Sequence, residues 1–443
     1  MAVERTGVNV SELINTEKIG WGAVSVVAWC FALLVFDGYD FVILGNVAPS
    51  IVKDWGVARS AFAPVFAAGV FGLIAGALLF GPVADRFGRR RAIILAGIVF
   101  GIFTFASAGA TSLGGLMILR FFASVGLGGV NPNAIALVSE YVPDKRRATA
   151  IAIAILGFTG GGALGGFIAA QLLRHYDWPA VFIVGGVVPI VIAIVMYFLI
   201  PESVRLLALR PGNDLMIARA LRKVFPHRTF ADDAHYYVTE EEPRGFPVIQ
   251  LFQQRRAPVT TLLWLGQFTN QVVILFLNSW LPILITSNGI PIADAVQASA
   301  MVQVGGVVGG LLFSPLLDLF GIVSIGIAFT LAALAVAALG MFGTAIGTIA
   351  LLAFIAGFFV LGGQLGQTGV IGIVYPPAIR ATGAGWAIGI GRWGAVLGPI
   401  LGGVLVADKL PSSSLFAIAA IPDVFAAASF FVLSALKCER DRE

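Results

Sequence analysis

The stretch LLVFDGYDFVILGN, residues 33–46, places two carboxylates, Asp37 and Asp40, inside an apolar segment that carries no other charge from Trp21 to Pro49. About 20 apolar residues in a helix are enough to cross a bilayer, so this segment predicts a membrane span. An ionised Asp near the centre of a span costs roughly 2.5–3.5 kcal/mol on insertion scales. Residues three apart share a helix face, so both carboxylates are expected to face one polar cavity. The alternative for either Asp alone is a helix cap or a permanent pair with an Arg.

The composition of the whole chain is that of a polytopic membrane protein. Of its 443 residues, 58% are hydrophobic and 12% are charged, whereas soluble domains average about 25% charged residues. The basic residues form short runs between apolar segments, where they indicate membrane orientation and give no case for nucleic-acid binding. Cys30 and Cys438 have neither metal-ligand nor disulfide spacing. We therefore expect no metal and no cofactor.

Twelve apolar segments are long enough to span a membrane, which predicts an all-α integral membrane fold. The expected spans are residues 22–46, 60–83, 91–110, 114–139, 148–171, 178–200, 258–283, 293–317, 322–343, 346–372, 381–405 and 412–436.

Short-loop Lys and Arg residues predict the orientation. One set of loops holds Arg86, Arg89 to Arg91, Lys145 to Arg147 and the basic residues of the long central segment, and is expected in the cytoplasm. The alternate loops hold Lys53, Arg59 and Arg174, partly offset by Asp54 and Asp177. Both termini are then cytoplasmic. The expected divisions are an N-terminal segment 1–21, six-helix bundles 22–200 and 258–436, a linker 201–257 and a tail 437–443.

A repeat with a constant offset of 233 residues relates the two halves. The loop GPVADRFGRRR at 81–91 matches SPLLDLFGIVS at 314–324, and the same offset relates pairs at three other places. The matched pairs include Pro82 and Pro315, Asp85 and Asp318, Gly88 and Gly321, Arg147 and Arg380, Gly161 and Gly394, Gly165 and Gly398, and Pro49 and Pro282. Two halves in the same orientation form the parallel-repeat plan of a secondary transporter.

The loop GPVADRFGRRR also resembles the signature loop of the major facilitator superfamily. The resemblance implies a charge latch that holds the two halves in one state and breaks in the other. A simple orientation anchor would explain the arginine run but not Asp85 or the two glycines. The expected latch residues are Asp85, Arg86, Arg89, Glu140, Arg147 and, in the degraded second copy, Asp318.

Within that superfamily, DGYD at 37–40 resembles the hallmark of the aromatic acid:H+ symporter family. The similarity extends along the chain through LRFFASVGLGGVNPN (119–133), EYVPDKRRAT (140–149) and GRWGAVLGPILGG (391–403). The resemblance implies import of an aromatic carboxylate with a proton by alternating access. The fifth span lacks the Gly-Pro pair expected of antiporters of this superfamily, which favours symport.

Depth in the membrane suggests which charges meet. At 1.5 Å per residue, Asp37 lies roughly 22 Å along an outward span, about 8 Å from the outer edge of a ~30 Å core. Arg120 lies roughly 9 Å from the same edge on an inward span. We therefore predict Arg120 as the partner of the proton-linked acids Asp37 and Asp40. A fixed structural pair or an Arg that reaches the interface is the alternative.

Arg392 lies about 16 Å deep, near the midplane, and is expected to be the only charge at that depth in the last six spans. A guanidinium binds a carboxylate through two parallel hydrogen bonds, so Arg392 is our first choice for holding the substrate. A permanent pair with an acid of the other half is the alternative. Further candidate substrate contacts are polar or aromatic neighbours of these charges: Tyr39, Asn270, Gln271, Gln364 and Trp393.

Three other interpretations stay open. The first is an exporter of the same superfamily, and the second is a symporter of another organic acid or small metabolite. The third is an integral-membrane enzyme, which the scattered three histidines and the lack of a phosphate or metal motif disfavour. The expected partners are a small aromatic acid, H+ and the lipid bilayer, and a monomer in the cell (inner) membrane is the default.

Overall fold

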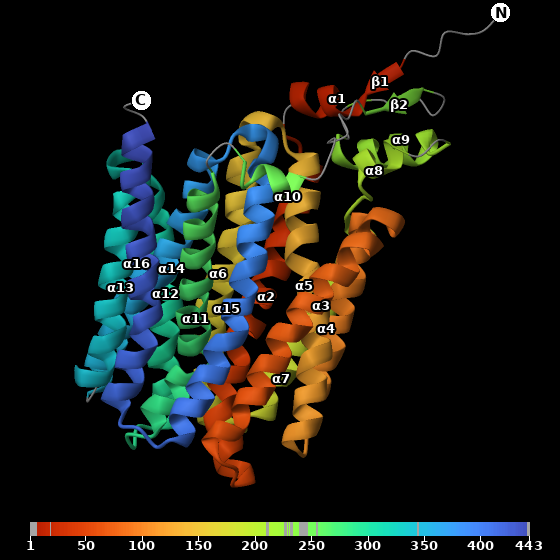
Figure 1. Cartoon of the computed structure of the whole chain (residues 1–443). Helices are drawn as coiled ribbons and strands as arrows, with labels where there is room; N and C mark the ends of the chain where they lie inside the picture. Colours follow the sequence, from red (N-terminus) through yellow and green to blue (C-terminus); the bar gives the residue numbers. More distant parts are fainter. Residues whose placement is uncertain are drawn as a thin grey trace, which may run out of the picture.

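The computed structural model describes residues 7–17, 19–209, 212–225, 228, 230, 234–238, 247–253, 256–342 and 345–440. Long, roughly parallel helices form one bundle, and both chain ends lie at the same end of it (Figure 1). Within the described ranges, twelve helices are long and apolar enough to cross a membrane. The predicted number of spans is confirmed.

The spanning helices divide into two sets of six that follow each other along the chain. Those of the N-terminal half are α2 (Trp21–Trp55), α3 (Ala63–Phe87, preceded by the short helix η1, Arg59–Phe62), α4 (Arg89–Ser107), α5 (Leu113–Tyr141), α6 (Asp144–His175) and α7 (Pro179–Leu199). Those of the C-terminal half are α11 (Ala257–Thr286), α12 (Ile292–Phe320), α13 (Val323–Phe342), α14 (Ile346–Val374), α15 (Pro377–Ala407) and α16 (Ser412–Arg440).

The two halves repeat the same packing. Helix α2 packs on α6, α3 on α5 and α4 on α7, and the equivalent pairs α11 with α15, α12 with α14 and α13 with α16 pack in the second half. Between the halves, α2 meets α11, α3 meets α15 and α6 meets α12. Equivalent helices thus make equivalent contacts in the two halves, which confirms the predicted parallel repeat of two six-helix halves.

Glycines at repeat positions allow the closest of these helix contacts. A Cβ atom on Gly161 would lie 1.9 Å from the carbonyl oxygen of Val35, and one on Gly394 would lie 2.0 Å from that of Phe268. Both the glycines and their partners are related by the offset of 233 residues. Only glycine lets the two backbones approach so closely, so the repeat seen in the sequence is a repeat of helix contacts.

A small cap of short elements lies beside the end of the bundle that holds the termini (Figure 1). Strand β1 (Gly7–Asn9) pairs in parallel with β2 (His235–Tyr237), which ties the N-terminal segment to the central linker. The other elements are α1 (Val10–Thr16), α8 (Val204–Ala208), α9 (Asp214–Val224) and α10 (Pro247–Gln250). The linker therefore contains short helices and a strand.

Candidate functional site

A cavity of about 450 Å³ lies between the two halves and holds most of the charges predicted inside the membrane. Its walls come mainly from α2, α3 and α5 on one side and from α11 and α15 on the other. Asp37, Asp40, Arg120, Gln271 and Arg392 all line it. Small-molecule pockets range from roughly 300 to 1,000 Å³, so the cavity suits a ligand of one aromatic ring.

Asp40 and Arg120 form a closed network that Thr104 completes. The guanidinium donates from Nη1 to Asp40 Oδ1 at 3.0 Å and from Nη2 to Thr104 Oγ1 at 2.6 Å, and the threonine hydroxyl donates to the same Asp40 oxygen at 3.1 Å. Arg120 also lies over the Phe182 ring, 5.1 Å from its centroid. Both charged side chains are buried. Each charge is thus compensated within the N-terminal half.

Asp37 has different surroundings, although it lies only one turn away on the same helix. Its carboxylate hydrogen-bonds the Asn131 side chain, and Asp40 and Arg392 are its charged neighbours. Arg392 belongs to α15 and donates from Nη1 to the Leu73 carbonyl oxygen of α3 at 3.3 Å. Among the described residues, Asp37 therefore has a cationic neighbour, Arg392, that belongs to the opposite half.

Arg120 was expected to lie at the same depth as Asp37, but in the structure it forms its ion pair with Asp40. The expected depths assumed that the first residue of α2 lies at the membrane edge and that the span ends at residue 46, but the helix continues to Trp55. A helix of 35 residues is longer than the hydrocarbon core is thick, so counting from its first residue misplaces both acids.

Four predicted substrate contacts fall outside the cavity lining. The Tyr39 hydroxyl donates to the Val181 carbonyl oxygen at 2.9 Å, so the ring points between helices of its own half. Asn270 is 0% exposed and donates to Gln364 Oε1 at 2.6 Å. Trp393 is 56% exposed and lies beside Phe71, with ring centroids 6.5 Å apart. Neighbours on a helix point about 100° apart, so adjacency to a site residue in sequence did not predict a shared cavity.

The cavity contains polar side chains that sequence reasoning did not single out. Asn131 and Ser124 come from α5, and Ser279 comes from α11. Asn131 could have been found, because it is a polar residue next to a proline in the middle of an apolar span. Phe41 and Phe66 supply aromatic walls.

The C-terminal half also holds an acid that the depth argument overlooked. Asp423 is fully buried in α16, and neither of its carboxylate oxygens has a hydrogen-bond partner among the described residues. Arg392 was expected to be the only charge at its depth in the last six spans. Asp423 shows that this expectation was wrong. Asp423 does not line the cavity, so it leaves the arrangement of Asp37 and Arg392 unchanged.

The predicted latch residues gather at the end of the bundle near the termini. Arg89 forms an ion pair with Glu140, and Arg147 forms one with Asp144 in the first turn of its own helix. Asp85 and Arg86 are exposed in the last turn of α3, and Asp318 is exposed near the end of α12. The recorded pair of Arg147 lies within one half, so a latch between Asp85 and Arg147 remains a prediction.

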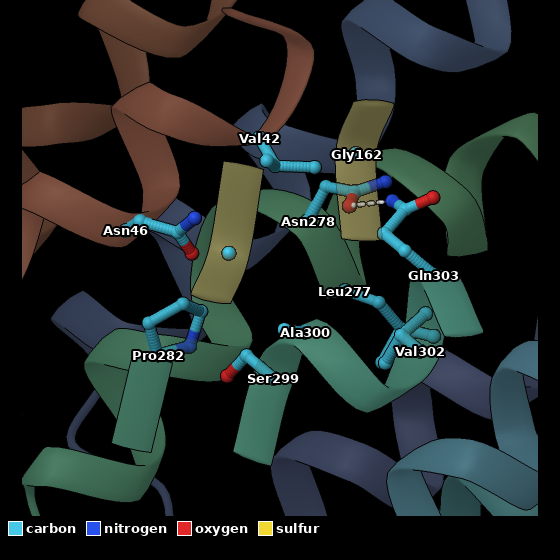
Figure 2. A pocket seen from close by; sticks show the side chains of 11 residues that line it. Val42, Asn46, Gly162, Leu277, Asn278, Pro282, Ser299, Ala300, Val302 and Gln303 are labelled. Atoms are coloured by element: carbon cyan, nitrogen blue, oxygen red, sulfur yellow. Dashed lines mark hydrogen bonds between the residues drawn. The ribbon is translucent and has the colours of Figure 1, made fainter. Parts of the chain in front are cut away.

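The opposite end of the cavity is closed by contacts between the halves (Figure 2). Gln303 of α12 donates to Asn278 Oδ1 of α11 at 2.8 Å within the C-terminal half, and Gly162 of α6, in the N-terminal half, lies against the Gln303 side chain. The void left between them and Asn46 is about 10 Å³, about one water probe. Further out, Arg174 of α6 donates to Asp294 of α12 at 2.8 Å.

Comparison with known proteins agrees with this architecture. The family model described as Major Facilitator Superfamily matches residues 30–345. The chain is 35% identical to the gallate transporter of Pseudomonas putida, over 95% of this chain and 94% of that protein. It is 34% identical to a 4-hydroxybenzoate transporter of Acinetobacter baylyi, over 98% and 96%.

A solved D-xylose-proton symporter has the same fold, with a TM-score of 0.68 and 18% identity over 92% of this chain and 96% of that chain. The family model covers most of the sequence, and the relatives align over nearly all of it. The chain therefore belongs to the Major Facilitator Superfamily.

Proposed function

We propose that this protein imports an aromatic carboxylate of the benzoate or hydroxybenzoate type together with a proton, by alternating access of a central site. Membership in a family of transporters excludes the membrane-enzyme hypothesis. The names of the aligned relatives support the choice of substrate class, since they are transporters of gallate and of 4-hydroxybenzoate.

The observation that carries the proposal is the placement of Asp37 and Arg392 on opposite halves of one cavity. Arg392 has a backbone carbonyl and the charge of Asp37 as its recorded neighbours, and it can turn its guanidinium toward a ligand carboxylate. When Asp37 takes up a proton, its attraction for Arg392 is removed. A substrate carboxylate then replaces Asp37 as the counter-ion, so proton and substrate binding favour each other.

The Asp40–Arg120–Thr104 network supports a different role for the second acid. Its hydrogen bonds are mutually satisfied, and all of its members lie in the N-terminal half. We propose that this network holds α2, α4 and α5 in register and keeps a fixed ion pair beside Asp37. Asp40 and Arg120 then act on coupling through position and charge, while Asp37 carries the proton.

The closed end supports an inward-facing state if the termini are cytoplasmic. We propose that both termini and the linker 201–257 lie in the cytoplasm, and that the protein is a monomer of the cell (inner) membrane. Rocking of the halves then opens the end where Gly162 meets Gln303 and Arg174 meets Asp294. The basic residues near the other end, such as Arg89 to Arg91, support this orientation.

The test is uptake of radiolabelled 4-hydroxybenzoate and benzoate by cells that express the wild type or Arg392→Ala, with and without a protonophore. We expect protonophore-sensitive uptake by the wild type and none above background by the variant, at equal abundance in the membrane. Wild-type uptake that the protonophore leaves unchanged would contradict proton coupling. If neither acid is taken up, the aromatic-acid assignment is wrong while the family assignment stands.

A further inference from the structure

A second cavity lies between the two halves at the end of the bundle away from the termini. Its volume is about 680 Å³. Lys53, Arg59 and Arg174 of the N-terminal half line one side of it, and Thr286 and residues 289–293 around the α11–α12 connection line the other. We call this space the basic vestibule.

The positive charge of the basic vestibule is largely uncompensated. Within the part of the chain that the structure describes, Lys53 and Arg59 are exposed and take part in no recorded hydrogen bond or ion pair. Arg174 is held by Asp294 and by Gln297 Oε1 at 2.7 Å. Asp54, the acid next to Lys53, accepts a hydrogen bond from Trp178 Nε1 at 3.1 Å.

The vestibule also offers apolar surface for a ring. Val52, Leu173, Ile283, Ile290 and Ile292 line it together with the three cations. Basic residues are normally depleted on the outer side of a membrane protein, so the orientation rule does not account for this cluster. Cations beside an apolar wall match an anion with an apolar ring.

Successive turns of α11 connect the vestibule to the central cavity. Gln271 and Leu275 line the central cavity, Asn278 lines both that cavity and the small void drawn in Figure 2, and Pro282 lines the void. Ile283 and Thr286 then line the vestibule. The vestibule thus lies on the line that leads out of the central cavity, beyond the closed constriction.

We propose that the basic vestibule is a capture site for aromatic carboxylates, which binds the anion outside the closed constriction before the central cavity opens to that side. The carboxylate would lie between Lys53 and Arg59, and the ring against Ile290 and Ile292. This proposal rests on the proposed function, since it names an earlier position for the same class of substrate.

Binding in the vestibule would affect both the encounter of the substrate with the protein and the opening of the closed end. A patch of one sign raises the local concentration of the opposite ion, and the effect falls as salt screens the charges. An anion in the vestibule would also compete with Asp294 for Arg174, the ion pair that joins α6 to α12 across the halves. Binding there would therefore weaken a contact that keeps this end closed.

The first experiment measures initial uptake of 4-hydroxybenzoate against concentration in cells, at low and at high ionic strength. For Lys53→Gln/Arg59→Gln we expect KM to rise about three- to tenfold at low ionic strength, with the maximal rate per transporter unchanged and the difference abolished by salt. Lys409→Gln is the matched control, because Lys409 is an exposed cation of the α15–α16 connection at the same end but outside the vestibule. An unchanged KM, or an equal shift in the control, would overturn the proposal.

A second experiment separates this proposal from the proposed function. Thr286→Cys, in the transport-deficient Arg392→Ala background, is labelled with a membrane-impermeant thiol reagent in the presence of 4-hydroxybenzoate or of phenol. We expect protection by the acid alone, and its loss when Lys53→Gln/Arg59→Gln is added. Protection without transport by the intact chain would contradict only the proposed function. Transport without protection would overturn only the capture site.

Discussion

The two halves share one backbone plan but hold different polar groups at equivalent positions. The offset of 233 residues pairs Asp37 with Asn270 and Arg120 with Ala353. In the N-terminal half, Asp40, Arg120 and Thr104 form a charged network at the cavity wall. In the C-terminal half, Asn270 bonds Gln364 and Gln367 bonds Gln267 at 2.7 Å, all without charge.

This difference indicates where the proposed coupling between the halves arises. A duplicated frame gives both halves the same helix contacts, as the glycine pairs show. The charges are not duplicated: both acids lie in the N-terminal half together with Arg120, and Arg392 lies in the other half. Rocking of the halves therefore changes the distance between Asp37 and Arg392, while the network around Asp40 moves as a unit.

The largest expected effect comes from removing the cation of the C-terminal half. Arg392→Ala is expected to abolish uptake, because no other cation of that half lines the cavity among the described residues. Arg392→Lys keeps the charge but loses the bidentate geometry, so we expect uptake reduced about ten- to a hundredfold. Uptake kinetics at matched membrane abundance check both. Equal uptake by the wild type and Arg392→Ala would show that the cation of the C-terminal half does not hold the substrate carboxylate.

The next effect concerns stability of the charged network in the N-terminal half. Breaking a buried ion pair by removing one partner costs about 3–5 kcal/mol, so Arg120→Ala is expected to lower the thermal unfolding temperature strongly. Asp40→Asn/Arg120→Gln leaves no uncompensated charge and should cost less than the sum of the single changes. Thermal unfolding of the purified protein in detergent gives the values. Additive effects would mean that the two side chains do not act as a pair.

A smaller effect separates two neighbouring residues of α11. Gln271 lines the cavity and Asn270 is sealed between α11 and α14. We expect Gln271→Ala to raise KM a few-fold with little change in stability, on the scale of one lost hydrogen bond of about 1 kcal/mol. Asn270→Ala should lower stability by about 1–2 kcal/mol and leave KM unchanged, since it leaves Gln364 without its donor. The reverse pattern would mean that Asn270, and not Gln271, contacts the substrate.

The smallest effect is expected at Asp423, the buried acid of α16. Helices α11 and α13 pack against α16 and contain no Asp, Glu, Lys, Arg or His. An ionised carboxylate would have nothing there to replace its lost hydration, so the neutral amide of Asp423→Asn should be accepted with uptake unchanged. Loss of proton-driven uptake in this variant would mean that Asp423, an acid of the C-terminal half, takes part in proton coupling.

The sequence was sufficient for the fold, because hydrophobic length, short-loop charge and a constant repeat offset are properties of the chain itself. It also identified four charges of the cavity, since a charge in an apolar span is conspicuous. The sequence did not show which of these charges form ion pairs with one another. Whether Arg120 meets Asp37 or Asp40 depends on where α2 begins relative to the membrane and on how far it continues past residue 46.

Side-chain direction was the second limit. Tyr39 and Trp393 lie next to cavity charges in sequence but point away from the cavity, because consecutive helix residues point in different directions. Asn131 and Ser279 were missed, because amides and hydroxyls in spans commonly serve helix packing and only the three-dimensional arrangement shows which of them face a ligand.

The most direct test of the central claim compares two modes of transport in proteoliposomes that contain the wild type or Asp37→Asn. One mode is accumulation of 4-hydroxybenzoate driven by an imposed pH gradient, and the other is exchange of labelled for unlabelled 4-hydroxybenzoate without a gradient. Asn mimics a protonated Asp, so the account predicts that Asp37→Asn loses gradient-driven accumulation and keeps exchange. Accumulation that still follows the pH gradient in Asp37→Asn would contradict the assignment of the proton to Asp37.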